Sequence, residues 1–171
     1  MCYLMFMVKL LLMYICKWSK REMNIYYDNM NYSNVIKGSY IVPIQSEELL
    51  KKAQEDFELE IKKNKLSPAG NLTYFFEKIN ESALRLSFLL PVENIDNVKE
   101  SKIQIFSYYG QEQVLCCRVI RKELEKLENI IDKMEEKCKA DGCRMYGPLY
   151  FVLPQKNEDT YLYLKIGVID M

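Results

Sequence analysis

The sequence has no histidine and only six glycines among its 171 residues. Without histidine, the common zinc ligand sets and the histidine-activated serine or cysteine nucleophiles are excluded. No Lys, Glu or Asp is spaced to replace histidine as the base. The glycines form neither a phosphate-cradling loop nor a dinucleotide-binding fingerprint. We therefore expect no metal, no cofactor, no catalytic residues and no enzymatic activity.

The sequence also lacks an excess of charge of either sign. Lys and Arg number 24, as do Asp and Glu, so the formal net charge is zero. No overall positive field is available to hold phosphates by counterion release, and we expect no direct contact with nucleic acid. Hydrophobic residues make up 49% and charged residues 28%, which is the composition of a globular domain.

The six cysteines do not follow the spacing of a zinc site or a disulfide framework. Cys116 and Cys117 are adjacent in an expected strand, so their side chains face opposite ways and cannot easily bridge each other. Cys138 falls on the apolar stripe of an expected helix, where a free thiol behaves as a small hydrophobe. This usage predicts reduced thiols and a cytoplasmic protein.

Residues 1–22 differ from the rest of the chain. Residues 1–18 are almost wholly apolar, apart from Lys9 and Lys17. Three interpretations remain open: translation that begins at Met23, a membrane anchor, or a signal peptide. A span needs about 20 apolar residues, and no small-residue cleavage site follows this segment. We expect contact with a membrane only if residues 1–18 are part of the translated protein. We also expect a chain that starts at Met23 to fold.

From residue 23 onward the chain repeats one pattern. A strand-like stretch, a charged amphipathic helix and two more strands recur at a spacing of roughly 75 to 78 residues, in copies at about 23–92 and 101–170. The helices are expected at 46–65 and 121–139. One copy has a sheet face that it cannot bury alone. The sequence therefore predicts a single domain over residues 23–171, built from both copies.

Alternation along the strands predicts which side chains pack under the helices. This helix-facing set is Leu84, Leu86, Phe88, Leu90, Leu115, Cys117, Val119, Leu162, Leu164, Ile166 and Val168. The fold class that we expect is α+β, with two pseudosymmetric β-α-β-β repeats forming an antiparallel sheet and two long helices on one side of it.

This layout resembles the GyrI-like domain, the effector-binding module of bacterial transcription activators and of free-standing drug-binding proteins. The resemblance covers roughly residues 24–170. It rests on the duplication, on the passage from Asp141-Gly142 to Gly147-Pro148 entering a strand, and on the closing strand. The chain also resembles small uncharacterised Firmicute proteins encoded beside LXG-type toxin genes.

The resemblance implies a groove between the repeats that binds a small, often cationic, amphipathic molecule through a buried glutamate and aromatic rings. This sequence departs from the pattern because residues 149–153, in the penultimate strand, include no acidic residue. Glu77, at the end of the matching strand in the first copy, is the nearest candidate, and a solvated carboxylate is the alternative interpretation. The apolar residues 1–22 cannot form a helix-turn-helix, so we expect no direct role as a transcription factor.

The candidate ligand-binding residues carry rings or charges on the strands. They are Glu77, Arg85, Arg118, Tyr150, Tyr161, Tyr163 and Lys165. Three cations against one carboxylate favour an anionic or neutral ligand. A solvated antiparallel sheet has the same mixed face, so this pattern alone does not establish a site. Two functions remain open: a stand-alone sensor or sequestering protein for a small amphipathic molecule, and an adaptor or immunity-type protein partner in a toxin or secretion locus.

Overall fold

The computed structural model describes residues 24–44, 46–96, 98, 102–154 and 161–171. Our expectations for residues 1–22 lie outside this part of the chain. The strands are β1 (Asn24–Pro43), β2 (Leu72–Lys78), β3 (Ala83–Pro91), β4 (Gln104–Ile120), β5 (Cys143–Leu153) and β6 (Tyr161–Asp170), and the helices are α2 (Glu47–Lys63) and α3 (Leu127–Ala140). A 3-10 helix, η1 (Arg121–Lys126), leads into α3.

The six strands form one closed antiparallel barrel in the order β1-β3-β2-β5-β6-β4. The class and the antiparallel pairing agree with the sequence prediction, but the closure corrects the simple sheet that we expected. The barrel closes because Leu72–Phe75 of β2 pairs with Tyr150–Leu153 of β5, so that neither strand is left as a sheet edge. Both segments are strongly apolar, and burial on both faces accounts for that composition.

The strand order is unchanged when the two halves of the chain are exchanged. β1 pairs with β3 and β3 with β2, just as β4 pairs with β6 and β6 with β5. The halves meet twice, through β1 with β4 and through β2 with β5. A pseudo-twofold axis would produce this order, and the superposition of the two halves stays a prediction.

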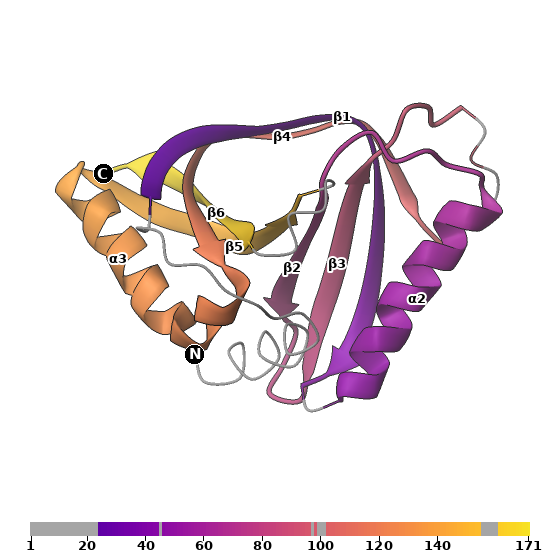
Figure 1. Ribbon diagram of the computed structural model, residues 1–171, viewed down its shortest axis with the longest axis horizontal. Coiled ribbons are helices and arrows are strands. Elements are labelled where there is room, and N and C mark those ends of the chain that lie inside the picture. Colours follow the sequence, from indigo (N-terminus) through magenta and orange to yellow (C-terminus); the bar gives the residue numbers. More distant parts are fainter. Residues whose placement is uncertain (1–23, 45, 97, 99–101, 155–160) are drawn as a thin grey trace.

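The two helices lie at opposite ends of the molecule, α2 beside β1 and β3 and α3 beside β5 and β4 (Figure 1). Ser46 caps α2 by accepting the backbone N–H of Leu49 at 3.3 Å, as its sequence position indicates. α3 ends at Asp141-Gly142, and Gly142 takes the left-handed conformation with φ of 76°. The second helix was expected from residue 121, but its first six residues are the 3-10 helix η1.

The buried side chains of both helices belong to one apolar cluster on the outer face of the barrel. Leu50 and Phe57 of α2 share it with Ile130, Met134 and Cys138 of α3. Of the helix-facing strand residues that we predicted, ten are buried in this cluster and Ile166 packs against it. Strand parity was therefore predicted correctly, because alternation depends only on the local backbone.

A second, smaller cluster occupies the inner face of the barrel. Its buried members are Met30, Val35, Phe75, Leu89, Val114 and Tyr150, and the half-buried Tyr32, Phe106 and Tyr109 pack against them. We call these nine residues the inner cluster. Five of the nine are aromatic, so the inner face offers ring surface rather than the aliphatic packing found under the helices.

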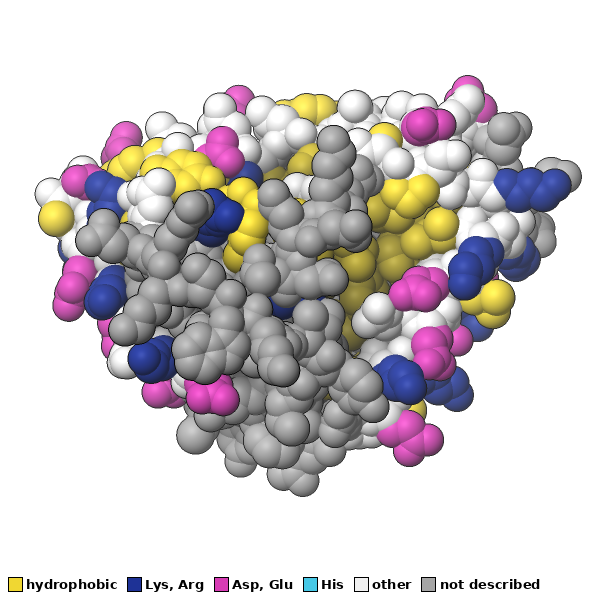
Figure 2. Space-filling view, viewed as in Figure 1, with side chains coloured by type: hydrophobic (Ala, Val, Ile, Leu, Met, Phe, Trp, Pro, Cys, Tyr) yellow, Lys and Arg dark blue, Asp and Glu magenta, His cyan; other side chains and the backbone are white. Residues whose placement is uncertain are grey.

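Charges of both signs are interspersed on the surface around α2, with apolar side chains recessed beside it (Figure 2). The side chains of Cys116, Cys117, Cys138 and Cys143 are all buried. Among the described residues, no helix is both long enough and apolar enough to cross a bilayer.

Candidate functional site

Two neighbouring irregularities open the barrel wall at one end of the inner face. The β1–β4 register shifts between Asp28 and Met30, next to Gln111 and Val114 of β4. The β5–β6 register shifts between Tyr146 and Tyr150. Gly147 has φ of 79° and Pro148 has no N–H, so β5 bends away from β6 at this point. We had expected the strand to begin at Gly147-Pro148; instead these residues form a bulge inside a longer strand.

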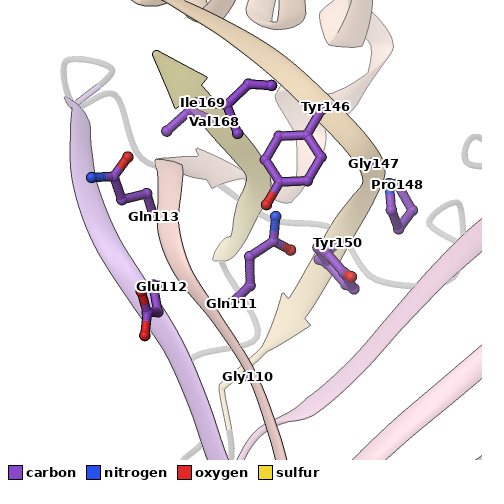
Figure 3. Close-up of a pocket in the computed structure, with 10 residues that line it drawn as sticks. All are labelled: Gly110, Gln111, Glu112, Gln113, Tyr146, Gly147, Pro148, Tyr150, Val168 and Ile169. Atoms are coloured by element: carbon purple, nitrogen blue, oxygen red, sulfur yellow. The ribbon is translucent and has the colours of Figure 1, made fainter.

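A pocket of about 560 Å³ lies between these irregularities. It is lined by Gly110, Gln111, Glu112, Gln113, Tyr146, Gly147, Pro148, Tyr150, Val168 and Ile169. Gln111, Tyr146 and Tyr150 point toward the same space, whereas Glu112 and Gln113 lie on the other side of β4 (Figure 3). The volume is in the range of small-molecule sites, which are commonly about 300 to 1,000 Å³.

Tyr150 connects this pocket to the inner cluster. Its side chain is 5% exposed and its hydroxyl lies 3.2 Å from that of Tyr109, while its ring meets Phe75 edge to face at 5.1 Å. Burial raises the pKa of Tyr150 well above its ordinary value, and the hydrogen bond with Tyr109 and the charge of Glu77 add to this effect. Burial also raises the pKa of Tyr109. Both phenols are therefore neutral hydrogen-bonding groups at neutral pH.

Two of the three predicted cations are paired with carboxylates. Arg85 lies opposite Glu77 in the β2–β3 register, with 3.7 Å between Nη1 and Oε2. Lys165 donates to Oδ2 of Asp28 at 2.6 Å and to the carbonyl oxygen of Asn29 at 3.4 Å. Asp28 was not predicted, because nothing local indicates that β1 and β6 lie on either side of β4, close enough for their side chains to pair.

The remaining predicted residues form a small group at the start of β6. The guanidinium of Arg118 lies 3.6 Å from the ring centroid of Tyr161, and that ring meets Tyr163 edge to face at 5.6 Å. Arg118 and Tyr163 are register partners across β4 and β6. Arginine stacked in this way keeps its outer N–H groups available to a ligand or to water.

The predicted residues therefore occupy three places rather than one. Tyr150 lines the pocket, and Lys165 is its register neighbour on β6. Glu77 and Arg85 form a pair elsewhere on the inner face, although Glu77 is close enough to influence Tyr150. Tyr161, Tyr163 and Arg118 lie outside the pocket lining.

Sequence reasoning missed Gln111, Tyr146 and Tyr109 as site residues. One local indication is the Tyr108-Tyr109-Gly110 run, because the observed register shift follows directly after it. The second local indication is Gly147, a glycine that takes a positive φ at the bulge in β5. Within the described residues, no group of three or more Cys, Asp or Glu side chains is arranged to hold a metal ion.

Comparison with solved structures shows the fold. The crystal structure of the EcmrR C-terminal domain aligns with 87% of this chain and 99% of its own, with a TM-score of 0.62 and 12% identity. EcmrR in its DNA complex also gives a TM-score of 0.62, at 13% identity. That alignment covers 87% of this chain and spans 58% of the EcmrR chain.

A crystal structure of a hydrolase from Listeria innocua aligns with a TM-score of 0.56 and 14% identity, over 88% of this chain and 93% of its own. No protein-family model and no curated protein sequence matches the chain. At these identities the likeness concerns the fold alone, and the chain shares its fold with the EcmrR C-terminal domain.

Proposed function

We propose that the protein binds a small amphipathic molecule at the pocket between β4 and β5, as a sensor or sequestering protein. The observation that carries the proposal is the pocket itself, in which a few polar groups converge beside an aromatic inner cluster. Ligand sites in proteins combine apolar and aromatic walls with a small number of placed polar groups. The shared fold is compatible with the proposal, because the same fold forms the C-terminal domain of EcmrR, a protein solved in complex with DNA.

The charges of the inner face favour an uncharged or anionic ligand over a cation. Arg85 and Lys165 are neutralised by Glu77 and Asp28. The Nζ of Lys37 lies 5.4 Å from the ring centroid of Phe75, and neither Lys37 nor Arg118 has a carboxylate partner among the described residues. A cationic ligand would therefore meet net repulsion on this face.

Tetraphenylborate and tetraphenylphosphonium test the proposal because they have the same shape and opposite charges. We expect the borate to raise the melting temperature of the full chain and the phosphonium to have a smaller effect, since bound ligand stabilises the folded state. Stabilisation by the phosphonium alone would show that the electrostatic argument is reversed. Failure of both ions, and of a panel of neutral aromatic amphiphiles, would contradict the proposed function.

Substitutions inside and outside the pocket lining test where the ligand binds. Tyr146→Ala removes a pocket ring that is 43% exposed, so it should weaken binding with little loss of stability. Tyr108→Ala is the matched control, because Tyr108 is also an exposed tyrosine, at 60%, and lies outside the pocket lining. Equal effects of the two substitutions on affinity would place the ligand elsewhere. We propose binding without turnover, so mass spectrometry should recover the bound molecule unchanged.

A further inference from the structure

The pocket carries almost no charge where its polar groups converge. Its ten lining residues include one ionisable carboxylate, Glu112, and that side chain lies on the other side of β4 from Gln111, Tyr146 and Tyr150 (Figure 3). The groups that face the shared space are therefore one carboxamide and two phenols. Each of these groups can both donate and accept a hydrogen bond.

Two of these three groups are available to a ligand. Gln111 and Tyr146 make no side-chain hydrogen bond within the part of the chain that the structure describes, whereas Tyr150 shares its hydroxyl with Tyr109. Gln111 is half-buried, and its amide can offer its N–H groups and its oxygen together. A bound group that hydrogen-bonds to both the N–H groups and the oxygen of this amide would replace the hydrogen bonds to water that are lost on binding.

Gly167 on β6 makes room for this amide. A Cβ at Gly167 would overlap Nε2 of Gln111 and would lie 2.9 Å from Cε1 of Tyr146. The glycine therefore allows the Gln111 side chain to lie against β6 at the pocket. Any larger residue at position 167 would move the amide, because the end of the glutamine side chain is the part that can shift.

We propose that this pocket selects an uncharged, planar group with a donor and an acceptor side by side, of the carboxamide or lactam class, which Gln111 hydrogen-bonds while Tyr146, Pro148 and Tyr150 cover its faces. The inference rests on the proposed function and narrows its ligand class. An ionised group at the same place would lose its hydration without meeting an opposite charge, which costs more than placing a neutral amide there.

Three indole derivatives that differ in one group provide the test: indole-3-acetamide, indole-3-acetate and tryptamine. Their affinities for the full chain at pH 7 are measured by titration calorimetry or NMR. We expect the amide to bind at least about fivefold more tightly than either ion. Gln111→Leu should weaken binding of the amide about tenfold, which corresponds to one hydrogen bond, and should change binding of the ions little.

Gln104→Leu is the matched control, since Gln104 lies on the same strand outside the pocket lining and should leave all three affinities unchanged. Tyr146→Phe and Gly167→Ala provide second variants, each expected to reduce the preference for the amide. Equal or tighter binding of either ion would overturn the inference, as would a preference that survives Gln111→Leu. If none of the three binds while the larger amphiphiles do, the ligand class is wrong and the proposed function stands.

Discussion

At the scale of single residues, the ion pair between Lys165 and Asp28 joins the last strand to the first. The Lys165 side chain is 12% exposed and the Asp28 side chain 42% exposed, with 2.6 Å between Nζ and Oδ2. Burial disfavours ionisation of Asp28, but the hydrogen bond from Lys165, the backbone N–H of Asn29 and the charge of Lys165 outweigh it. The pKa of Asp28 is therefore held below its ordinary value.

This pKa shift predicts how the pair contributes to stability as the pH changes. Because the pKa of Asp28 is lower in the folded state than in the unfolded state, ionisation of Asp28 stabilises the fold. This stabilisation is fully present above the unfolded-state pKa, about 3.9, and is lost as the pH falls through the folded-state pKa. Asp28→Asn should therefore lower the free energy of unfolding at pH 7 by no more than about 1 kcal/mol, since Asp28 is partly screened by solvent.

Urea unfolding of the wild type and of Asp28→Asn at several pH values provides the measurement. The difference between the two proteins should shrink below about pH 4. A difference that stays constant from pH 7 to pH 3 would show that the pair contributes nothing through ionisation.

Tyr74 gives a second prediction at this scale. Its side chain is 1% exposed and stacks on Phe151 with 5.0 Å between ring centroids, while its hydroxyl has no hydrogen-bond partner among the described residues. Tyr74→Phe removes an unsatisfied buried group and should leave stability unchanged or raise it by up to about 1 kcal/mol. Tyr74→Ala removes the packing as well and should cost about 3 to 5 kcal/mol.

Denaturant unfolding of both Tyr74 variants checks these values. The phenylalanine variant is the informative one, because it keeps the ring and its stacking. A loss of more than about 1 kcal/mol on Tyr74→Phe would show that the hydroxyl has a hydrogen-bond partner.

At the scale of elements, the pairing of β2 with β5 decides whether the sheet is open or closed. Four residue pairs join the two strands, from Leu72 opposite Leu153 to Phe75 opposite Tyr150. In an open sheet, half of the amides of each strand would face solvent. Hydrogen exchange should therefore show residues 72–75 and 150–153 protected as fully as the strands that flank them. Fast exchange of alternate amides in both segments would contradict the closed barrel.

The bulge in β5 depends on the conformation of Gly147. Its φ is 79°, and a Cβ at this position would meet no atom within 4 Å, so Gly147→Ala would be strained by the backbone alone. We expect a loss of about 1 kcal/mol in the free energy of unfolding. Gly142→Ala is a matched comparison, because Gly142 has φ of 76° and equal space. No loss at Gly147 with a loss at Gly142 would show that the bulge adopts another conformation.

The elements that the sequence predicted well are those with local causes. The Ser46 cap, the end of α3 at Gly142 and the alternation of Leu84, Leu86 and Phe88 each follow from a few neighbouring residues. Closure of the barrel was not predicted, because the pairing of Leu72 with Leu153 joins residues far apart in the chain. Sequence spacing cannot indicate such a contact.

The candidate site was predictable only in part for the same reason. Tyr150 was singled out as a ring near the groove, and it lines the pocket. Gln111 becomes a site residue only because the irregularities in β4 and β5 face each other across the pocket. The partner of Lys165 lies 137 residues away, so charge counting on single strands overestimated how many cations were unpaired.

At the scale of the whole molecule, the residues that line the proposed site all come from the second half of the chain, but the inner cluster behind it joins both halves. Phe75 comes from β2 in the first half, whereas Tyr109, Gln111, Tyr146 and Tyr150 come from the second. The inner cluster exists only where the closed barrel brings these strands together. The central claim is therefore that the pocket lined by β4, β5 and β6, backed by the inner cluster of the closed barrel, holds a small molecule beside Tyr150.

Chemical-shift mapping on the ¹⁵N-labelled full chain tests this claim most directly, with the amphiphile that gives the largest thermal shift as the probe. The account predicts that the largest shifts fall on residues 109–113, 146–150 and 167–169, which surround the pocket. Shifts confined to the outer face of α2 or α3, or no shifts at saturating ligand, would contradict it.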